Sequence, residues 1–301
     1  LQEALAAICG MDAFSLAPFA GSHGEWAGLR MIRAYHEARG ESKRIKALIP
    51  DSAHGTNPAN AAIAGFTVVN IPSGEDGTVD VAALRAHLGD DTAVLMMTNP
   101  NTLGLFEKNV QKISKMCHEA GALLYYDGAN ANAVMGLMRP GDMGFDVMHV
   151  NLHKTFGAPH GGGGPGSGPV GCRAFLREYL PAPVVRETNG AYEAAVPQKS
   201  IGRVGAFHGN FLVALRAYCY ILSLGAEGLK EASVRALVNA NYLRKKLAPL
   251  FGGPFAPCMH EFVVSLSDLK ARTGVGALDF AKALIDFGMH PPTMYFPLIV
   301  K

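Results

Sequence analysis

The sequence predicts an α/β fold in which helices cover both faces of a mainly parallel central sheet. From about residue 46 onward, short apolar runs alternate with amphipathic stretches, which is the pattern of consecutive strand and helix units. The chain also has 301 residues, of which 49% are hydrophobic and 17% charged, so it can bury a sizeable core. These two observations indicate a globular protein built around one large sheet.

Each element is expected where its pattern occurs along the chain. Strands are expected in the short apolar runs, at 47–50, 67–72, 93–98, 122–127, 147–152 and 169–173. Helices are expected in the amphipathic stretches, at 25–39, 79–88, 110–120, 211–224 and 226–247. Asp80 provides a start signal for one of these helices, and Gly121 a stop signal for another.

A change of composition divides the chain into two parts. Residues 247–257 are rich in glycine and proline, and the residues after them predict a strand at 260–267, a helix at 277–288 and a strand at 295–300. We therefore expect a large domain over residues 1–250 and the start of a smaller α/β domain over residues 251–301. Because the chain begins with Leu1 and stops directly after a strand-like segment, we expect both domains to be incomplete.

Charge, hydropathy and cysteine content exclude several classes of partner. The formal net charge is +2, from 27 basic and 25 acidic residues without a long basic run, so neither nucleic acid nor a membrane surface is expected as a partner. The longest apolar candidate, near 211–224, is interrupted by Arg216 and is shorter than the ~20 residues that cross a bilayer. The five cysteines contain no CxxC pair, which favours reduced thiols in a cytosolic compartment.

Lys154 is the strongest local signal for chemistry. It lies in Asn151-Leu152-His153-Lys154-Thr155-Phe156, which closes a strand candidate and leads into the glycine-rich loop 161–168. A lysine in this position can approach a bound carbonyl group and form an imine with it. A single lysine is more often a solvated surface residue, so the assignment of Lys154 depends on the residues that accompany it.

Asp127 is the first of these companions. It ends the apolar run 122–127 and precedes Lys154 by 27 positions. A carboxylate at the carboxyl edge of an open α/β sheet lies where such folds bind ligands, and it can keep a pyridine nitrogen protonated. Considered alone, Asp127 could also be a helix cap or a turn residue before Gly128.

A candidate phosphate site precedes the first expected helix. Gly21, Ser22 and His23 lie directly before the helix expected at 25–39. Small residues at a helix N-terminus expose backbone N–H groups which, together with the Ser22 hydroxyl, would suit a phosphate. The alternative is a capping box in which Ser22 caps the helix and Glu25 follows three residues later.

Two further strand ends carry polar side chains. His54 follows the strand expected at 47–50, and its imidazole could stack on a pyridine ring, although a loop histidine is more often structural. Thr98 ends the strand expected at 93–98. Because the carboxyl ends of parallel strands meet at one sheet edge, His54, Thr98, Asp127 and Lys154 are expected to lie together there.

Two alternatives use other residues. His149, His153, His160 and Cys172 could be considered zinc ligands, but a strand over 147–152 would place His149 and His153 about 13 Å apart at ~3.3 Å per residue. The loop 161–166 also matches the dinucleotide-binding pattern GxGxxG. That pattern needs a strand before it and a helix after it, which this proline-containing loop is not expected to have.

In combination, these motifs resemble a known family. The order of glycine-flanked helix start, strand-end histidine, strand-end aspartate and strand-end His-Lys resembles the fold-type I pyridoxal-phosphate enzymes. Within that superfamily, the chain is similar over nearly its whole length to glycine decarboxylase, the P-protein of the glycine cleavage system, either the second subunit of the two-subunit bacterial form or the C-terminal half of the single-chain form. The similar segments are Ser52-Ala53-His54-Gly55-Thr56-Asn57-Pro58-Ala59, Asp127-Gly128-Ala129-Asn130, the Lys154 segment, Gly161-Gly162-Gly163-Gly164-Pro165-Gly166 and His290-Pro291-Pro292-Thr293-Met294-Tyr295-Phe296-Pro297.

The resemblance implies an enzyme that holds pyridoxal phosphate covalently on Lys154. It implies catalytic roles for Lys154, His54, Asp127 and His153, the last as a cofactor contact or proton-transfer group with a structural role as the alternative. The cofactor-binding set that it implies is Lys154, Asp127, His54, Ser22, His23, Gly21, Thr98 and Asn130. No metal is implied.

The resemblance also implies the reaction and the partners. Glycine would lose its carboxylate as carbon dioxide, and its aminomethyl group would pass to the lipoyl arm of the carrier H-protein. A homologous first subunit or a second copy of the chain would complete the assembly, in the bacterial cytoplasm or, for a eukaryotic form, in the mitochondrial matrix. The alternatives are another fold-type I enzyme acting on a small amino acid, and a noncatalytic partner subunit.

Overall fold

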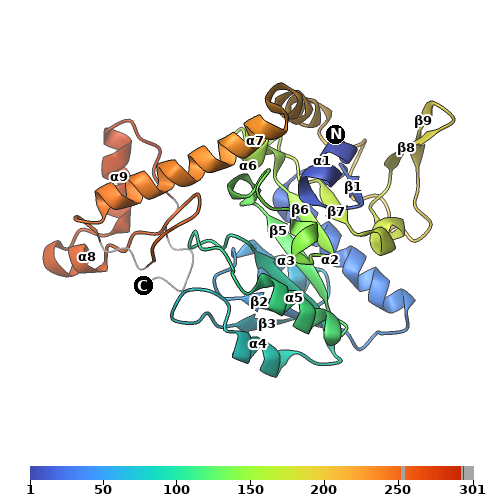
Figure 1. Cartoon of the computed structure of the whole chain (residues 1–301), viewed down its shortest axis with the longest axis horizontal. Coiled ribbons are helices and arrows are strands. Elements are labelled where there is room, and N and C mark those ends of the chain that lie inside the picture. Colours follow the sequence, from blue (N-terminus) through green and yellow to red (C-terminus); the bar gives the residue numbers. More distant parts are fainter. Residues whose placement is uncertain (252–254, 293, 295–301) are drawn as a thin grey trace.

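A seven-stranded sheet forms the centre of the computed structural model, which describes residues 1–251, 255–292 and 294 (Figure 1). The strand order is β1-β7-β6-β5-β4-β2-β3. The strands are β1 (Ala13–Ser15), β2 (Lys46–Pro50), β3 (Thr67–Ile71), β4 (Thr92–Thr98), β5 (Leu123–Gly128), β6 (Val147–Val150) and β7 (Val170–Cys172). Strands β2 to β6 pair in parallel, whereas β7 pairs antiparallel with β6 and β1, so the predicted α/β fold with a mainly parallel sheet is confirmed.

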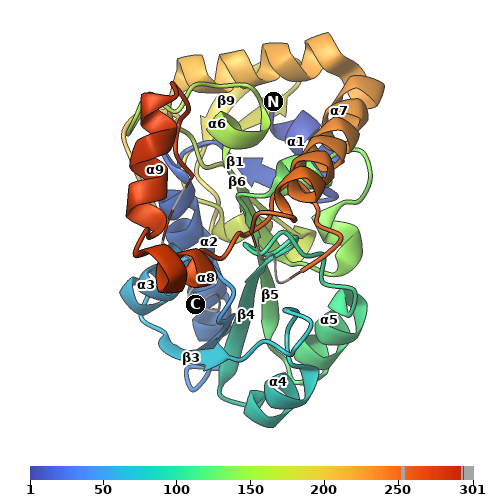
Figure 2. The ribbon, with the colours of Figure 1, turned by 90° about the vertical axis from the view of Figure 1, so that its left-hand side faces the viewer.

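Helices flank the sheet on both faces, with α2 and α3 on one side and α5 on the other (Figure 2). The α-helices are α1 (Gln2–Cys9), α2 (Gly21–Ala38), α3 (Thr56–Ile63), α4 (Val81–His87), α5 (Val110–Glu119), α6 (Leu152–Thr155), α7 (Phe211–Leu247), α8 (Ser267–Thr273) and α9 (Ala277–Asp286). Short 3-10 helices are η1 (Ala131–Ala133), η2 (Pro140–Met143) and η3 (Ala174–Tyr179). A hairpin of β8 (Val184–Thr188) and β9 (Ala191–Ala195) projects from the body (Figure 1).

Side chains along each strand point alternately to the two faces of the sheet, which divides the core into two layers. On β5, Tyr125 packs into the layer under α2 and α3, whereas Tyr126 packs into the layer on the opposite face. Successive side chains of a strand point to opposite faces, so Asp127 follows Tyr125 onto the α2 and α3 face. The same alternation places His149 of β6 and Thr98 of β4 on that face, because Val147 and Met96 belong to its layer.

Two elements that position the candidate site, α2 and β6, have different ends from those expected from the sequence. Helix α2 begins at Gly21 rather than at residue 25, and its N-cap is Ala20 without a side-chain cap. Strand β6 stops at Val150, and one helical turn, α6, carries His153 and Lys154. The expected strand over 147–152 is therefore too long, because the chain turns into α6 as soon as it leaves the ladder with β5.

The segment after α7 differs more strongly from expectation. The strand expected at 260–267 does not form; instead Met259 donates its N–H to the Gly104 carbonyl (2.7 Å) and the segment follows the loop after β4. Helix α9 matches the helix expected at 277–288, whereas the strand expected at 295–300 lies outside the described residues. Division into domains at residue 250 remains a prediction.

Helix α7 is long and apolar enough to cross a membrane by length and composition, and is the one such helix in the described part of the chain. The sequence predicted none, because the apolar run near 211–224 is shorter than the ~20 residues that cross a bilayer and is interrupted by Arg216. Gly225, with φ 61° and ψ −171°, breaks the helical backbone between 211–224 and 226–247, and the two parts run in different directions (Figure 2). The predicted division of this region into two helices is confirmed.

Substitution of Gly28 by alanine should destabilise the fold. A Cβ at this position of α2 would lie 2.5 Å from Tyr125 Cε2 and 2.9 Å from Val147 Cγ1, so the helix would have to move away from the sheet. We expect Gly28→Ala to lower the free energy of unfolding by about 1–3 kcal/mol in urea titrations. Gly74→Ala is the control, since a Cβ there meets its nearest atom at 3.5 Å; equal stability of the two variants would contradict the close-packing argument.

Candidate active site

Four parallel strands bring the predicted residues to one edge of the sheet. Strands β6, β5, β4 and β2 are neighbours in the sheet, and their carboxyl ends lead to Lys154, Asp127, Thr98 and His54 respectively. Open α/β sheets bind ligands at this edge. The predicted convergence of strand ends is therefore present in the fold.

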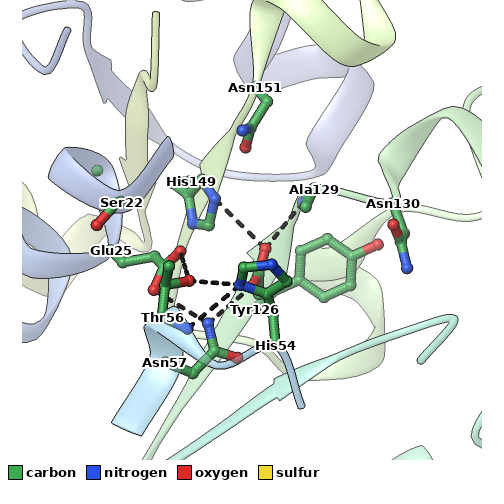
Figure 3. A network of polar contacts seen from close by, with 12 residues as sticks. Ser22, Glu25, His54, Thr56, Asn57, Tyr126, Ala129, Asn130, His149 and Asn151 are labelled. Carbon is green, nitrogen blue, oxygen red and sulfur yellow. Dashed lines mark hydrogen bonds and ion pairs between the residues drawn. The ribbon is translucent and has the colours of Figure 1, made fainter. Parts of the chain in front are cut away.

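Asp127 is the centre of this edge and is only 2% exposed. Its Oδ2 accepts a hydrogen bond from Asn57 Nδ2 (2.9 Å), and its Oδ1 accepts one from the Ala129 N–H (2.9 Å) and lies 3.3 Å from His149 Nε2 (Figure 3). Burial by itself raises the pKa of Asp127, but His149, Asn57, Ala129 and the charge of Lys154 together lower it below its ordinary value. Asp127 is thus held as a carboxylate.

Glu25 is a second buried carboxylate behind Asp127, and its side chain contacts three residues of α3 (Figure 3). Its Oε1 accepts from Thr56 Oγ1 (2.8 Å), and its Oε2 accepts from the side-chain amides of Asn57 (3.0 Å) and Asn60 (2.9 Å). One amide nitrogen, Asn57 Nδ2, therefore donates to both Glu25 and Asp127. Glu25 therefore orients the Asn57 amide, and this amide in turn orients the Asp127 carboxylate.

Sequence reasoning missed this role of Glu25, because it considered Glu25 only as a capping-box residue. The helix begins earlier than expected, so Glu25 lies in its second turn and points across to α3 instead of back to the N-cap. The sequence does contain one signal for this role of Glu25: it lies between Gly24 and Gly28, two positions at which α2 touches the sheet. A charged residue beside such contacts must find buried partners.

His149 connects the network to the core through Tyr125. Tyr125 Oη lies 3.1 Å from the Gly24 carbonyl oxygen and 3.0 Å from His149 Nδ1. The phenol has one proton, and the carbonyl can only accept it, so His149 Nδ1 must donate if both contacts are hydrogen bonds. His149 Nε2 lies 3.3 Å from Asp127 Oδ1, so the imidazole links Tyr125 to the carboxylate.

The metal-ligand alternatives do not match this geometry. The ligand atoms of Glu25, Asp127 and His149 lie within 4.8 Å of one another, but the Asn57 amide donates to both carboxylates in the space between them. Of the zinc ligands considered from the sequence, His149 is committed to Tyr125 and Asp127, while His153 lies against His160 with ring centroids 4.9 Å apart. The side chains of Glu25, Asp127 and His149 belong to a hydrogen-bond network.

The glycine-rich loop does not have the geometry of a dinucleotide-binding turn. Helix α6 precedes it and strand β7 follows it, which reverses the strand-loop-helix order that the pattern requires. Gly161, Gly162, Gly163 and Gly164 all have positive φ angles, which glycine adopts readily. The loop turns the chain from Lys154 back into the sheet.

Lys154 is exposed at this edge, on the single turn of α6. Its positive charge acts to lower the pKa values of Asp127, His153, His260 and Glu261. Next to it, His153 Nδ1 accepts the Ser167 N–H (3.2 Å), and its pKa is lowered by burial and by the charges of His160 and Lys154. Lys154 and Asp127 thus lie at or just after the ends of neighbouring strands, and their joint role in a cofactor site stays a prediction.

The structure separates the predicted phosphate residues. Gly21 packs against Asn151 so closely that a Cβ would lie 2.3 Å from its Nδ2, which places the start of α2 beside the Lys154 segment. Ser22 Oγ accepts from Asn60 Nδ2 (2.9 Å). His23 lies apart from them: its Nδ1 accepts the Phe19 N–H (3.2 Å), and its ring packs near Phe19 and Trp26.

His54 lies close to Thr56 and Asn57, whereas Asn130 lies apart from them (Figure 3). His54 is exposed, and its Nδ1 lies 2.9 Å from Thr56 Oγ1, so the loop after β2 is tied to Glu25 through Thr56. The Asn130 amide donates to the Pro100 carbonyl (3.0 Å) and to Glu261 Oε1 (3.0 Å). Glu261 and its neighbour His260 were not predicted as site residues, because their segment was expected to be a strand of the smaller domain.

Several buried polar atoms at this edge have no hydrogen-bond partner, which fits a site for a polar ligand such as a phosphorylated pyridine. Buried polar groups are normally paired, and unpaired ones need an explanation. The atoms near the strand ends are Asn57 Oδ1, Thr98 Oγ1, Asn151 Oδ1, Thr155 Oγ1 and Ser167 Oγ. With Lys154 for the aldehyde and ionised Asp127 for the pyridine nitrogen, the residues present fit pyridoxal phosphate.

Solved structures share this fold. The chain aligns with the crystal structure of glycine decarboxylase (P-protein) of the glycine cleavage system at a TM-score of 0.80 and 22% identity, covering 98% of this chain and 68% of that one. Mouse CSAD aligns at a TM-score of 0.71 and 17% identity, covering 96% and 67%. A class-V aminotransferase family model also matches residues 37–163. Fold and site together define a fold-type I pyridoxal-phosphate protein.

Sequence relatives identify the family within this class. The chain is 61% identical to "probable glycine dehydrogenase (decarboxylating) subunit 2" of Treponema denticola and 58% identical to that of Caldanaerobacter subterraneus, in both cases over all of this chain and 63% and 62% of the relative. A model described as "glycine dehydrogenase, C-terminal domain" matches residues 232–300. The chain is thus similar over its whole length to glycine dehydrogenase (decarboxylating) subunit 2, and the resemblance predicted from the sequence is confirmed. It spans a little over three fifths of the length of these relatives.

Replacing Glu25 by glutamine should destabilise the protein. The glutamine oxygen can still accept from Asn57 and Asn60, but its NH2 group then faces the Thr56 hydroxyl, which loses its acceptor, and the negative charge that strengthens all three hydrogen bonds is gone. We expect the free energy of unfolding to fall by about 1–3 kcal/mol in urea titrations. Glu119→Gln, an exposed position at the end of α5, is the control; a loss no larger than in this control would show that the network carries little stability.

Proposed function

We propose that this chain binds pyridoxal phosphate on Lys154, decarboxylates glycine and transfers the remaining aminomethyl group to the lipoyl arm of a carrier H-protein. The observation that supports it most is the buried, ionised Asp127 at the strand end next to that of Lys154, in a chain similar to glycine dehydrogenase (decarboxylating) subunit 2. A protein titled glycine decarboxylase (P-protein) of the glycine cleavage system also has this fold.

The chemistry depends on the protonation state of Asp127. When bound, pyridoxal phosphate supplies an electron-accepting ring that stabilises negative charge at the substrate carbon. Asp127, kept ionised by Asn57, His149 and the Ala129 N–H, holds a proton on the pyridine nitrogen. His54, in the loop after β2, would stack on the ring of the bound cofactor and help to orient the substrate bond that is to be broken.

Other residues of the edge hold the phosphate and the substituents of the cofactor. The N–H groups that begin α2 at Gly21 and the Ser22 hydroxyl bind phosphate oxygens, and Thr98 Oγ1 offers an unpaired hydroxyl beside Asp127, its neighbour in the ladder. His153, neutral because its pKa is lowered, contacts the cofactor or moves a proton next to Lys154. His23 and Asn130 act through their neighbours, since their ring and amide contacts lie away from Asp127.

A partner chain covers the exposed apolar surface. Large apolar side chains are exposed on the first part of α7 (Phe211, Leu212 and Leu222), in the loop before it (Phe207), and on β9 or just after it (Tyr192 and Val196). Exposed apolar patches of this kind are typical of protein interfaces. We assign this surface to a homologous first subunit or a second copy of the chain, in the bacterial cytoplasm.

Replacing Lys154 by alanine should abolish covalent attachment of the cofactor. In the full-length protein, borohydride reduction after loading with pyridoxal phosphate should fix the cofactor to the wild type and leave the Lys154→Ala variant unmodified, as measured by mass spectrometry. Lys245→Ala, in the last turn of α7, is the matched control and should retain the adduct. A reducible adduct in Lys154→Ala would contradict the assignment.

Replacing Asp127 by asparagine should remove the electron sink while leaving some cofactor bound. With glycine, lipoylated H-protein and partner subunit present, we expect exchange of labelled bicarbonate into the glycine carboxyl group to fall by at least about 10²-fold, since a neutral amide cannot balance a protonated pyridine. Wild-type exchange without any response to H-protein would argue against glycine decarboxylation. Equal exchange in Asp127→Asn and wild type would argue against the role of Asp127.

A further inference from the structure

Two buried acids, Glu25 and Asp127, lie next to each other beside the carboxyl end of β5. They are 4% and 2% exposed, and ligand atoms of Glu25, Asp127 and His149 lie within 4.8 Å of one another. Among the described residues, neither acid forms an ion pair with a lysine or an arginine, and His149 is the neighbouring base. A histidine carries at most one positive charge, so two ionised acids leave at least one negative charge for a bound cation to balance.

The contacts of Glu25 show that both of its oxygens act as acceptors. Thr56 Oγ1 donates to Oε1 (2.8 Å), and the side-chain amides of Asn57 and Asn60 donate to Oε2 (3.0 and 2.9 Å). An amide nitrogen can only donate, so Oε2, which receives two of them, is an unprotonated oxygen. Glu25 is therefore bound as a carboxylate, and its charge strengthens the three hydrogen bonds.

The Asn57 amide connects the two acids (Figure 3). Its Nδ2 carries two protons and donates to Glu25 Oε2 (3.0 Å) and to Asp127 Oδ2 (2.9 Å). Its Oδ1 is buried and has no hydrogen-bond partner in the part of the chain that the structure describes, so the two acids set the orientation of this amide. Loss of the Glu25 charge would weaken one of the two contacts and let the amide turn, which would also change the contact with Asp127.

The contacts of Asp127 leave an acceptor position for a ligand. Each carboxylate oxygen has two lone pairs. Oδ1 accepts the Ala129 N–H (2.9 Å) and lies 3.3 Å from His149 Nε2, whereas Oδ2 accepts from the Asn57 amide and, among the described residues, from no other donor. An N–H group of a ligand can therefore bind Oδ2, the oxygen whose other hydrogen bond depends on Glu25.

We propose that Glu25 is a positioning residue that, together with Asp127, keeps the pyridine nitrogen of the bound cofactor protonated. This inference rests on the proposed function, which assigns that proton to Asp127 alone. Asp127 contacts the nitrogen, whereas Glu25 holds the Asn57 amide on Asp127 Oδ2 and adds a second negative charge nearby. Both effects favour the protonated nitrogen, because a neighbouring negative charge stabilises a positive charge in a buried site.

Nitrogen NMR of the bound cofactor measures this proton directly. The full-length protein is loaded with pyridoxal phosphate that carries ¹⁵N in the ring, and the ring-nitrogen signal is followed as the pH is raised over the range in which each variant stays folded. We expect the nitrogen to lose its proton at a pH lower by at least about one unit in Glu25→Gln than in the wild type. If the wild type does not titrate in that range, Glu25→Gln should still lose the proton within it.

Glu25→Asp separates the effect of the charge from a structural role. Aspartate keeps the negative charge but is one methylene group shorter, whereas glutamine keeps the length and loses the charge. We expect the cofactor nitrogen of Glu25→Asp to titrate closer to the wild type than that of Glu25→Gln, and a merely structural role predicts the reverse order. Glu119→Gln, the exposed control, should titrate like the wild type.

The outcomes for the wild type and the variants distinguish this inference from the proposed function. A wild type that takes up no pyridoxal phosphate on Lys154 would overturn the proposed function. A wild type that binds the cofactor and keeps its nitrogen proton over the same pH range as Glu25→Gln would overturn this inference alone. The same holds if Glu25→Gln titrates closer to the wild type than Glu25→Asp does.

Discussion

The ionised state of Asp127 depends on hydrogen bonds that the rest of the fold supplies. Burying a carboxylate costs several kcal/mol unless partners compensate for the lost water. Here the partners come from three different elements: Asn57 from α3, His149 from β6 and the Ala129 N–H from the turn after β5. Asp127 therefore stays ionised only while α3, β6 and β5 keep their positions relative to one another.

Glu25 extends this dependence to α2. It accepts hydrogen bonds from Thr56, Asn57 and Asn60, so the helix that starts beside Asn151 is tied to the helix that holds Asp127. Partly satisfied buried networks are costly, whereas fully satisfied ones specify one arrangement. The start of α2, where we place the phosphate, and Asp127, where we place the pyridine nitrogen, are consequently held at a constant separation.

Residue-level motifs in the sequence predicted most of the sheet and much of the site. Apolar runs marked β2 to β7 within one to two residues, because buried parallel strands are continuous apolar segments. The short edge strand β1 and the hairpin of β8 and β9 were not predicted, since a three-residue strand is too brief for a pattern and an exposed hairpin is not selected for apolar residues. Strand-end positions of Lys154, Asp127, Thr98 and His54 followed from the parallel topology alone.

By itself, the sequence determined the fold class, the family and the residues that reach the carboxyl edge, because periodicity and strand-end motifs are local properties of the chain. Only the tertiary structure decided which of those residues face one another. It showed that Glu25 accepts from Asn57 instead of capping its helix, that His23 packs against Phe19, and that Glu261 accepts from Asn130 although the two lie far apart in sequence. The tertiary structure also decided the protonation states of the titratable side chains, because burial and neighbouring charges arise only when separate elements pack together.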